Sequence, residues 1–108
     1  MPSGSIPPGT LVMLVLRVLQ TGPLHGYAVA QRIHQLSSDA LQVEEGSLYP
    51  ALQRILVKGW AKAEWGVSET SRRVRFYRLT PAGRKQLASE MAVYERTSDA
   101  IRSILKLA

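Results

Sequence analysis

The sequence predicts a mainly α-helical fold with one small β-hairpin and a long C-terminal helix. Two patterns indicate this fold class. Apolar residues recur at helical spacing in four segments, and two short runs rich in aromatic and β-branched residues lie between the third and the fourth. The 108 residues are enough for one domain, and the hydrophobic share of 45% supplies its core. We therefore expect a single globular domain rather than a disordered chain.

The first nine residues are predicted to form a disordered tail. Residues 1–9 are mostly Pro, Ser and Gly, which bury too little apolar surface to offset the entropy lost on ordering. We expect this tail to be mobile. The domain then spans residues 10–80 and is followed by a terminal helix over residues 81–108.

Two helices are predicted at the start of the domain. The first spans residues 11–20 after Thr10, a favourable N-cap residue, and it ends at the Thr-Gly-Pro run of residues 21–23. Almost every position in this helix is apolar, so both of its sides must be covered. We expect the core to cover one side and a second subunit to cover the other. The second helix opens at residues 25–27, is amphipathic, and ends at the polar residues 37–39.

The third predicted helix carries a polar side with several candidate contact residues. It begins at Ser47 and ends at Gly59, with apolar residues at i, i+3, i+4, i+7 and i+8 on its buried side. Pro50 is tolerated because it lies in the first turn, where its missing N–H has no helical partner. The residues on the exposed side are Ser47, Tyr49, Pro50, Gln53, Arg54 and Lys58.

A β-hairpin and a long helix complete the chain. Residues 60–65 and 74–79 are predicted strands, separated by a long polar tip over residues 66–73. Thr80 and Pro81 then supply the N-cap and the first residue of a helix that meets no break before the last residue. Its 28 residues correspond to about 42 Å.

The last helix is predicted to form a dimer contact. A narrow apolar stripe on it follows the 4,3 spacing of a heptad repeat, while charged residues keep its other faces in water. Such a seam packs against another helix, so we predict a homodimer held by the first and last helices. Packing of its first three turns onto its own domain is the alternative. The predicted interface residues are Leu11, Leu14, Val15, Leu87, Met91, Tyr94, Ser98, Ile101 and Leu105.

Positive charge is concentrated in one part of the chain. The 14 Lys and Arg residues against 8 Asp and Glu residues give +6 overall. Residues 54–85 hold nine basic and two acidic side chains, or +7, which leaves −1 for the rest with its five basic and six acidic side chains. A local basic patch with interleaved aromatic residues favours an anionic partner, either nucleic acid or an acidic membrane surface. A solvated charged face is the alternative.

The order of the predicted elements decides between these partners. Three helices, a two-stranded hairpin and a further helix are the arrangement of a winged helix-turn-helix. In that fold the third helix enters the major groove of DNA, and the hairpin lies on the backbone or in the minor groove. We therefore predict that the chain binds double-stranded DNA.

Individual side chains suit different roles at such a contact. Gln53 suits bidentate bonding to adenine, Tyr49 suits a phosphate, and Arg54 suits either guanine or a phosphate. For Arg75, a cross-strand ion pair with Glu64 is an equal alternative to DNA contact. The predicted contacts at the hairpin tip are Arg72, Arg73 and Arg75.

Several function classes are excluded by what the chain lacks. Without cysteine it has no disulfide, thiolate zinc site or thiol nucleophile, which fits a reducing cytoplasm. Its longest apolar run, residues 11–16, is far shorter than the ~20 residues of a membrane span. His25 and His34 have no third ligand, and Glu44 and Glu45 precede a helix, where they suit capping rather than acid–base catalysis. We expect no enzyme activity, metal or cofactor.

Three stretches of the chain resemble signature motifs of the PadR family of bacterial transcriptional regulators. They are GPLHGY at residues 22–27, EGSLYPAL at residues 45–52 and FYRLTPAGR at residues 76–84, in the order and at the spacing of that family. The resemblance covers about residues 10–90. It implies a winged-helix homodimer that binds an inverted-repeat operator, usually as a repressor. It also implies DNA contacts on the basic tip and at Ser47, Tyr49 and Pro50.

The single C-terminal helix is similar to that of the small members of this family. In some of them, aromatic side chains on the dimer helices stack on planar drugs. The last helix here has Tyr94 and no Trp, and since Tyr94 lies on the heptad seam, we expect it to pack rather than to bind a ligand. Two other functions stay open. One is a protein-interaction module with an acidic partner, and the other is a sensor that binds a small hydrophobic effector in the dimer cleft.

Overall fold

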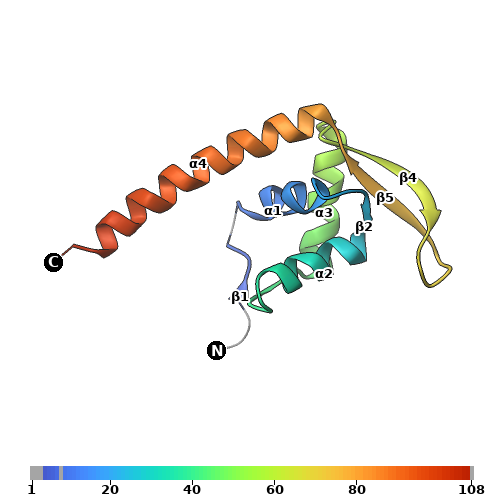
Figure 1. Cartoon of the computed structure of the whole chain (residues 1–108), viewed down its shortest axis with the longest axis horizontal. Coiled ribbons are helices and arrows are strands. Elements are labelled where there is room, and N and C mark those ends of the chain that lie inside the picture. Colours follow the sequence, from blue (N-terminus) through green and yellow to red (C-terminus); the bar gives the residue numbers. More distant parts are fainter. Residues whose placement is uncertain (1–3, 8, 108) are drawn as a thin grey trace.

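The structure, a computed structural model, describes residues 4–7 and 9–107, which hold four helices and five strands (Figure 1). The hairpin of β4 and β5 projects from one side of a cluster formed by the first three helices, and α4 extends away on the other side. This is the predicted mainly α-helical fold with a hairpin and a long C-terminal helix. In chain order the elements are β1 (Gly4–Ser5), α1 (Leu11–Leu19), β2 (Leu24–His25), α2 (Gly26–Leu36), β3 (Leu41–Gln42), α3 (Glu45–Val57), β4 (Ala61–Val67), β5 (Arg73–Leu79) and α4 (Pro81–Leu105).

The helices begin and end close to their predicted limits. α1 stops at Leu19 rather than at residue 20, and Thr10 holds its N-cap position. The Thr10 hydroxyl does not cap the helix but donates to the Pro7 carbonyl oxygen (2.7 Å). α3 begins two residues before Ser47, because the carbonyl oxygen of Glu44 already accepts a hydrogen bond from the Ser47 N–H (3.0 Å). Glu44 is the N-cap residue of α3, without a cap bond from its side chain.

The hairpin is part of a three-stranded antiparallel sheet in the order β2-β5-β4. β4 and β5 pair from Ala61 opposite Leu79 to Val67 opposite Arg73. The strands are therefore longer, and the tip shorter, than the runs of aromatic and β-branched residues at 60–65 and 74–79 predict. On the other edge of β5, β2 pairs with its middle and ties the start of α2 to the sheet.

The structure differs from the predicted disordered tail at residues 4–7. Gly4 and Ser5 pair in parallel with Leu41 and Gln42 of β3, and Ile6 packs against the core. Strand pairing satisfies backbone hydrogen-bonding groups whatever the side chains are, so composition gives no sign of it. Residues 1–3 and 8 of the predicted tail lie outside the described residues.

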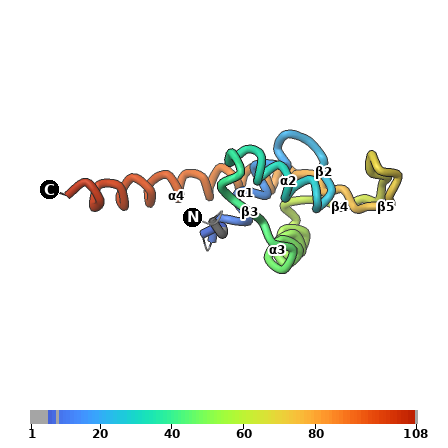
Figure 2. The backbone as a smooth tube through the Cα atoms, turned by 90° about the horizontal axis from the view of Figure 1, so that it is seen from below, coloured from blue at the N-terminus to red at the C-terminus, as the bar shows by residue number. Residues whose placement is uncertain are grey.

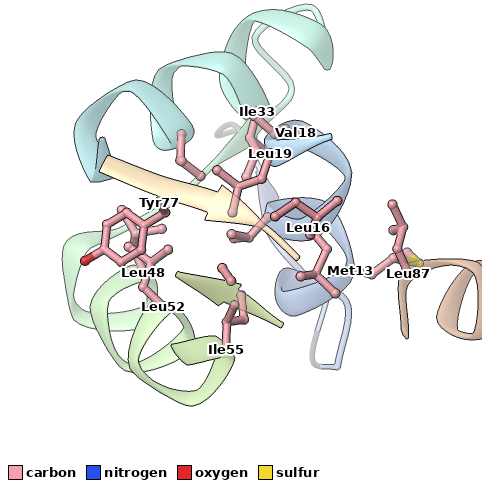
Figure 3. Close-up of a cluster of buried hydrophobic side chains, with 14 residues drawn as sticks. Met13, Leu16, Val18, Leu19, Ile33, Leu48, Leu52, Ile55, Tyr77 and Leu87 are labelled. Atoms are coloured by element: carbon pink, nitrogen blue, oxygen red, sulfur yellow. The ribbon is translucent and has the colours of Figure 1, made fainter. Parts of the chain in front are cut away.

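A hydrophobic core surrounds α1 and draws on α2, α3, the sheet and the start of α4 (Figure 3). Leu16 of α1 and Ile55 of α3 are fully buried in it. Complete burial of one such side chain stabilises the fold by about 1.5–3 kcal/mol. The residues of the core cluster are Met13, Val15, Leu16, Val18, Leu19, Val29, Ile33, Leu48, Leu52, Ile55, Ala61, Tyr77, Leu79 and Leu87.

Two of the predicted dimer-interface residues are buried inside the chain itself. Val15 is 0% exposed and Leu87 is 2% exposed, so neither is accessible to a second subunit. The reason is that α1 is the central helix, contacted by α2, α3, α4 and β5. The interface prediction is therefore wrong at Val15 and Leu87. At Leu87 the alternative is confirmed, in which the first turns of α4 pack on their own domain.

α4 is joined to the domain at its first turns. As predicted, Thr80 caps the helix, its hydroxyl oxygen accepting from the Gly83 N–H (3.0 Å). The same hydroxyl donates to the Gly59 carbonyl oxygen (2.7 Å), and the Thr80 N–H donates to the Trp60 carbonyl oxygen (3.0 Å). Beyond Leu87, every described residue of α4 is exposed or half-buried, and the helix runs away from the domain (Figure 2).

Candidate nucleic-acid interface

α3 presents a polar side to solvent. Four apolar residues of the helix face the core, and α3 stands out from the rest of the chain on one side of the molecule (Figure 2). This position leaves its outer side open to a partner. All of the residues predicted on this side are exposed, namely Ser47, Tyr49, Pro50, Gln53 and Arg54 on the helix and Lys58 at its C-cap.

Tyr49 packs the start of α3 against the start of α2. A Cβ atom added at Gly26 would lie 3.2 Å from the Cε1 atom and 3.3 Å from the hydroxyl oxygen of Tyr49, so a larger residue there would push the ring aside. Gly26 is buried under this contact, whereas Tyr49 is half exposed. Gly26 of the GPLHGY motif and Tyr49 of the EGSLYPAL motif therefore meet in space, and their contact helps to set the orientation of α3.

The tip of the hairpin is a tight hydrogen-bonded turn. The Ser68 N–H donates to the Arg72 carbonyl oxygen (2.8 Å), and the Ser71 N–H donates to the Ser68 carbonyl oxygen (2.9 Å). Ser71 takes the left-handed conformation at φ 63°, which reverses the chain. Arg72 and Arg73 are exposed at this end, and among the described residues neither has a carboxylate within ion-pair distance. Neither arginine of the tip is therefore held in an ion pair within the described part of the chain.

Trp65 brings two arginines together on one face of the hairpin. The guanidinium carbon of Arg73 lies 4.4 Å from the centroid of the Trp65 ring, and that of Arg75 lies 5.9 Å from it, both within cation–π range. Arg75 is opposite Trp65 in the strand pairing, so both side chains share a face. The Trp65 side chain is 60% exposed despite these contacts. We call Trp65, Arg73 and Arg75 the wing stack.

Glu64 pairs with Arg78 and not with Arg75. The Arg78 Nε donates to the Glu64 Oε1 atom (3.1 Å). Glu64 lies on the other face of the hairpin from Arg75, because neighbouring residues of a strand alternate between faces. The alternative that assigns Arg75 to an ion pair with Glu64 is therefore wrong. Since both Arg78 and Glu64 are well exposed, their pair contributes little to stability.

Tyr77 connects the wing stack to α3. Its ring centroid lies 6.0 Å from the guanidinium carbon of Arg75. Burial raises the pKa of the Tyr77 hydroxyl above its usual value, Arg75 lowers it again, and Tyr49 raises it. Tyr77 itself is buried, and both Arg75 on the hairpin and Tyr49 on α3 act on its hydroxyl.

Sequence reasoning does not select Trp65 as a site residue. An aromatic residue among basic residues is visible in the sequence, but only the strand register shows that Trp65 is opposite Arg75 and next to Arg73. The predicted strand also ends at Trp65, whereas β4 continues to Val67. The two further pairs, Gly66 with Val74 and Val67 with Arg73, extend the paired strands to Arg73 and so include it in the stack.

The two histidines have local structural roles. His25 is the N-cap of α2, and its Nδ1 atom accepts from the Ala28 N–H (3.3 Å), as expected for a helix-start residue. His34 lies between the Leu41 carbonyl oxygen (3.0 Å) and the Asp39 carboxylate (3.3 Å). Within residues 4–7 and 9–107, no three His, Asp or Glu side chains gather as metal ligands would. Over the same residues, no helix has both the length and the apolarity of a membrane-spanning segment.

Known proteins are similar to this chain in sequence and in fold. Residues 15–89 match the model of the transcriptional regulator PadR-like family. The chain is 43% identical over 86 residues to an uncharacterised 37.1 kDa protein in transposon Tn4556 of Streptomyces fradiae, covering 80% of this chain and 23% of that relative. It therefore spans about a quarter of that protein.

Two solved structures superpose on nearly the whole chain. A transcriptional regulator from Clostridium thermocellum is 28% identical with a TM-score of 0.83, over 91% of this chain and 95% of the other. A PadR family transcriptional regulator from Eggerthella lenta is 30% identical with a TM-score of 0.77, over 93% of this chain and 85% of the other. The similarity thus extends to α4, beyond the residues that the family model matches.

Proposed function

Because the chain belongs to the PadR-like family of transcriptional regulators, we propose that it binds a pseudo-palindromic DNA operator as a homodimer and represses transcription. Two exposed features carry this proposal, namely the polar side of α3 and the arginines of the wing stack. α3 would enter a major groove, where Gln53 and Arg54 read base edges. The arginines of the hairpin would hold the phosphate backbone beside it.

The proposed homodimer is supported by apolar side chains that α4 leaves in water. Met91 is 37% exposed, Tyr94 49%, Ile101 51% and Leu105 78%, and all four lie on the heptad seam. An apolar stripe of this kind on a helix is unfavourable unless another surface covers it. A second copy of α4 offers the same stripe, and Leu11 and Leu14 of α1 are half-buried and open to it.

The symmetry of such a dimer predicts the layout of its operator. In a two-fold dimer the two α3 helices enter successive major grooves about 34 Å apart, so the site has inverted half-sites about one helical turn apart. We place the protein in the cytoplasm with the DNA. Repression would follow if the operator overlaps a promoter, and transcription in vitro from the upstream region of its own gene, with and without the protein, tests this part.

A second candidate function is ligand sensing. A groove with a volume of about 390 Å³ lies between α1 and α4, and Met13, Val93 and Tyr94 contribute apolar atoms to it. A small hydrophobic effector seated there would shift the balance between conformations that bind DNA well and poorly. Thermal unfolding with a panel of hydrophobic compounds tests this, since a bound ligand raises the melting temperature.

Fluorescence anisotropy with two labelled duplexes tests the main proposal. The first duplex is the DNA upstream of the protein's own gene, and the second is a scrambled sequence of the same composition, each measured at two salt concentrations. A preference of about 10³-fold or more for the upstream DNA is expected. Equal binding to both would contradict a site in that region, and no binding to either would favour a protein-interaction module with an acidic partner.

Gln53→Ala is expected to reduce the preference for the operator about tenfold, because a bidentate contact from Gln to adenine discriminates against other bases. Binding to scrambled DNA should change little. The measurement is the ratio of the two dissociation constants. Gln35→Ala, which removes an exposed amide from α2, is the matched control. Equal losses on both duplexes would show that Gln53 does not read a base.

Arg73→Ala is expected to weaken binding to all sequences alike and to reduce the slope of log Kd against log salt by about one unit, as loss of one phosphate contact does. The measurement is a salt titration with the scrambled duplex. Arg96→Ala removes the same charge from an exposed position on α4 and should leave the slope unchanged. An unaltered slope for Arg73→Ala would mean that its guanidinium does not contact a phosphate.

A further inference from the structure

Trp65 is an exposed aromatic residue that the core does not require. It lies on β4, the edge strand of the three-stranded sheet, and its side chain is 60% exposed. Among the described residues, neither the core cluster nor the apolar residues packed against it include Trp65. A single exposed apolar side chain needs no explanation by itself, so the groups that surround the ring decide what it does.

The Trp65 ring contacts two cations that belong to no ion pair. The guanidinium carbons of Arg73 and Arg75 lie 4.4 Å and 5.9 Å from its centroid. Arg75 is also 6.0 Å from the ring centroid of Tyr77, so aromatic rings approach it from β4 and from β5. In the described part of the chain, neither arginine has a carboxylate within ion-pair distance. The contacts that hold these two side chains are therefore aromatic.

Stacking on a ring fixes an arginine without using its hydrogen-bond donors. A guanidinium contacts an aromatic ring with its flat face, whereas its N–H donors lie along its edge and match the oxygens of a phosphate. An arginine without such a contact samples many rotamers, and fixing it on binding costs conformational entropy. A ring that holds the side chain beforehand lowers this cost and leaves the donors available to an anion.

We propose that Trp65 is a positioning residue for DNA binding, and that its ring holds the guanidiniums of Arg73 and Arg75 ready to contact phosphates of the duplex. This inference rests on the proposed function, which assigns the hairpin arginines to the phosphate backbone. It is carried by the exposure of the ring and by the two cation–π distances. Direct contact between the Trp65 ring and DNA is the alternative, and a mutant cycle separates the two roles.

Two substitutions separate the aromatic face of Trp65 from its bulk. Trp65→Phe retains an aromatic face and is the matched control, whereas Trp65→Leu retains apolar volume without a ring. Because Trp65 is exposed and lies outside the core, both variants should keep the fold, which circular dichroism melting curves check.

The first measurement needs no DNA. The Nε–H resonance of Arg73 is followed in the ¹⁵N-labelled full chain, because a proton held over the face of an aromatic ring is shifted upfield. The upfield shift is expected in the wild type and in Trp65→Phe, and it should be lost in Trp65→Leu. A wild-type resonance at the position of a free arginine would overturn the proposal, since the ring would then not hold this side chain in solution.

The second measurement is a salt titration with the scrambled duplex. Trp65→Leu is expected to weaken binding about tenfold, because two arginines must then be ordered on binding. The slope of log Kd against log salt should stay unchanged, because every charge is retained. This pattern differs from that of Arg75→Ala, which should lower the slope by about one unit. Trp65→Phe is expected to bind within about threefold of the wild type. Wild-type affinity of Trp65→Leu would overturn the positioning role.

The mutant cycle decides whether Trp65 acts through the arginines. In a chain that already carries Arg73→Ala and Arg75→Ala, adding Trp65→Leu should cause no further loss, since the ring has no arginine left to hold. A second tenfold loss in that background would show that Trp65 contacts DNA itself, and it would overturn the proposal. If the wild type binds neither the upstream nor the scrambled duplex, the proposed function fails and this inference with it. If the wild type binds DNA and Trp65→Leu binds equally well, this inference alone fails.

Discussion

Gly83→Ala is expected to destabilise the fold by about 3 kcal/mol or more. A Cβ atom at this position would overlap the carbonyl oxygen of Trp60 and lie 2.7 Å from the Cδ1 atom of Leu79. The obstacle is backbone, which cannot turn aside as a flexible side chain does. To relieve this overlap, α4 would have to move away from the start of β4. That movement would break the hydrogen bond between the Thr80 N–H and the Trp60 carbonyl oxygen.

The measurement is chemical denaturation followed by circular dichroism, with Gly46→Ala as the matched control. Gly46 lies in the first turn of α3, and apart from its chain neighbours and the backbone of its own helix no atom lies within 4 Å of a Cβ added there. Alanine is a better helix former than glycine, so the control should be neutral or more stable by up to about 1 kcal/mol. Equal stability of Gly83→Ala and the wild type would show that α4 is not held closely against β4.

Ile101→Asp is expected to convert the proposed dimer into monomers and to lower operator affinity by a factor of about 100 or more. Ile101 lies on the exposed seam of α4, where a carboxylate would be buried without a partner once two helices meet. The two half-sites would then be bound independently, and the gain from linking two DNA-binding domains would be lost. Sedimentation velocity reports the mass, and anisotropy reports the affinity.

Ser103→Asp adds the same carboxylate to the side of α4 opposite the seam and serves as the control. It should sediment and bind DNA as the wild type does. The two substitutions are two residues apart, within one turn of the helix, so general weakening of α4 would affect both of them. Unchanged sedimentation of Ile101→Asp would overturn the assignment of the dimer contact to this seam.

The order and type of the helices are predictable from the sequence because each has a strong local signal. Apolar spacing predicts α3, and the Thr80-Pro81 pair predicts the start of α4 to the residue. The exposed side of α3 follows from the same spacing, which is why Gln53 and Arg54 are exposed in the structure as expected. Features that repeat along one element are thus accessible to sequence reasoning.

Features that depend on how elements meet are not accessible in the same way. Leu87 has the spacing of a dimer seam, yet the cap at Thr80 directs the first turns of α4 onto α1 and buries it. Trp65 gains its partners from strand register, and His25 gains its unpartnered Nε2 from burial beside Phe76. The pairing of residues 4–5 with β3 depends on backbone groups alone, which have no signature in the side chains.

The short attachment of α4 makes this helix a lever arm. Its 25 residues correspond to about 37 Å, while its hold on the domain is confined to the contacts of its first turns. A tilt of about 10° at that end would displace the other end by about 6 Å. In the proposed dimer, a small ligand or substitution near Trp60 would therefore change the distance between the two α3 helices without touching either, and their fit to half-sites of fixed spacing would change with it.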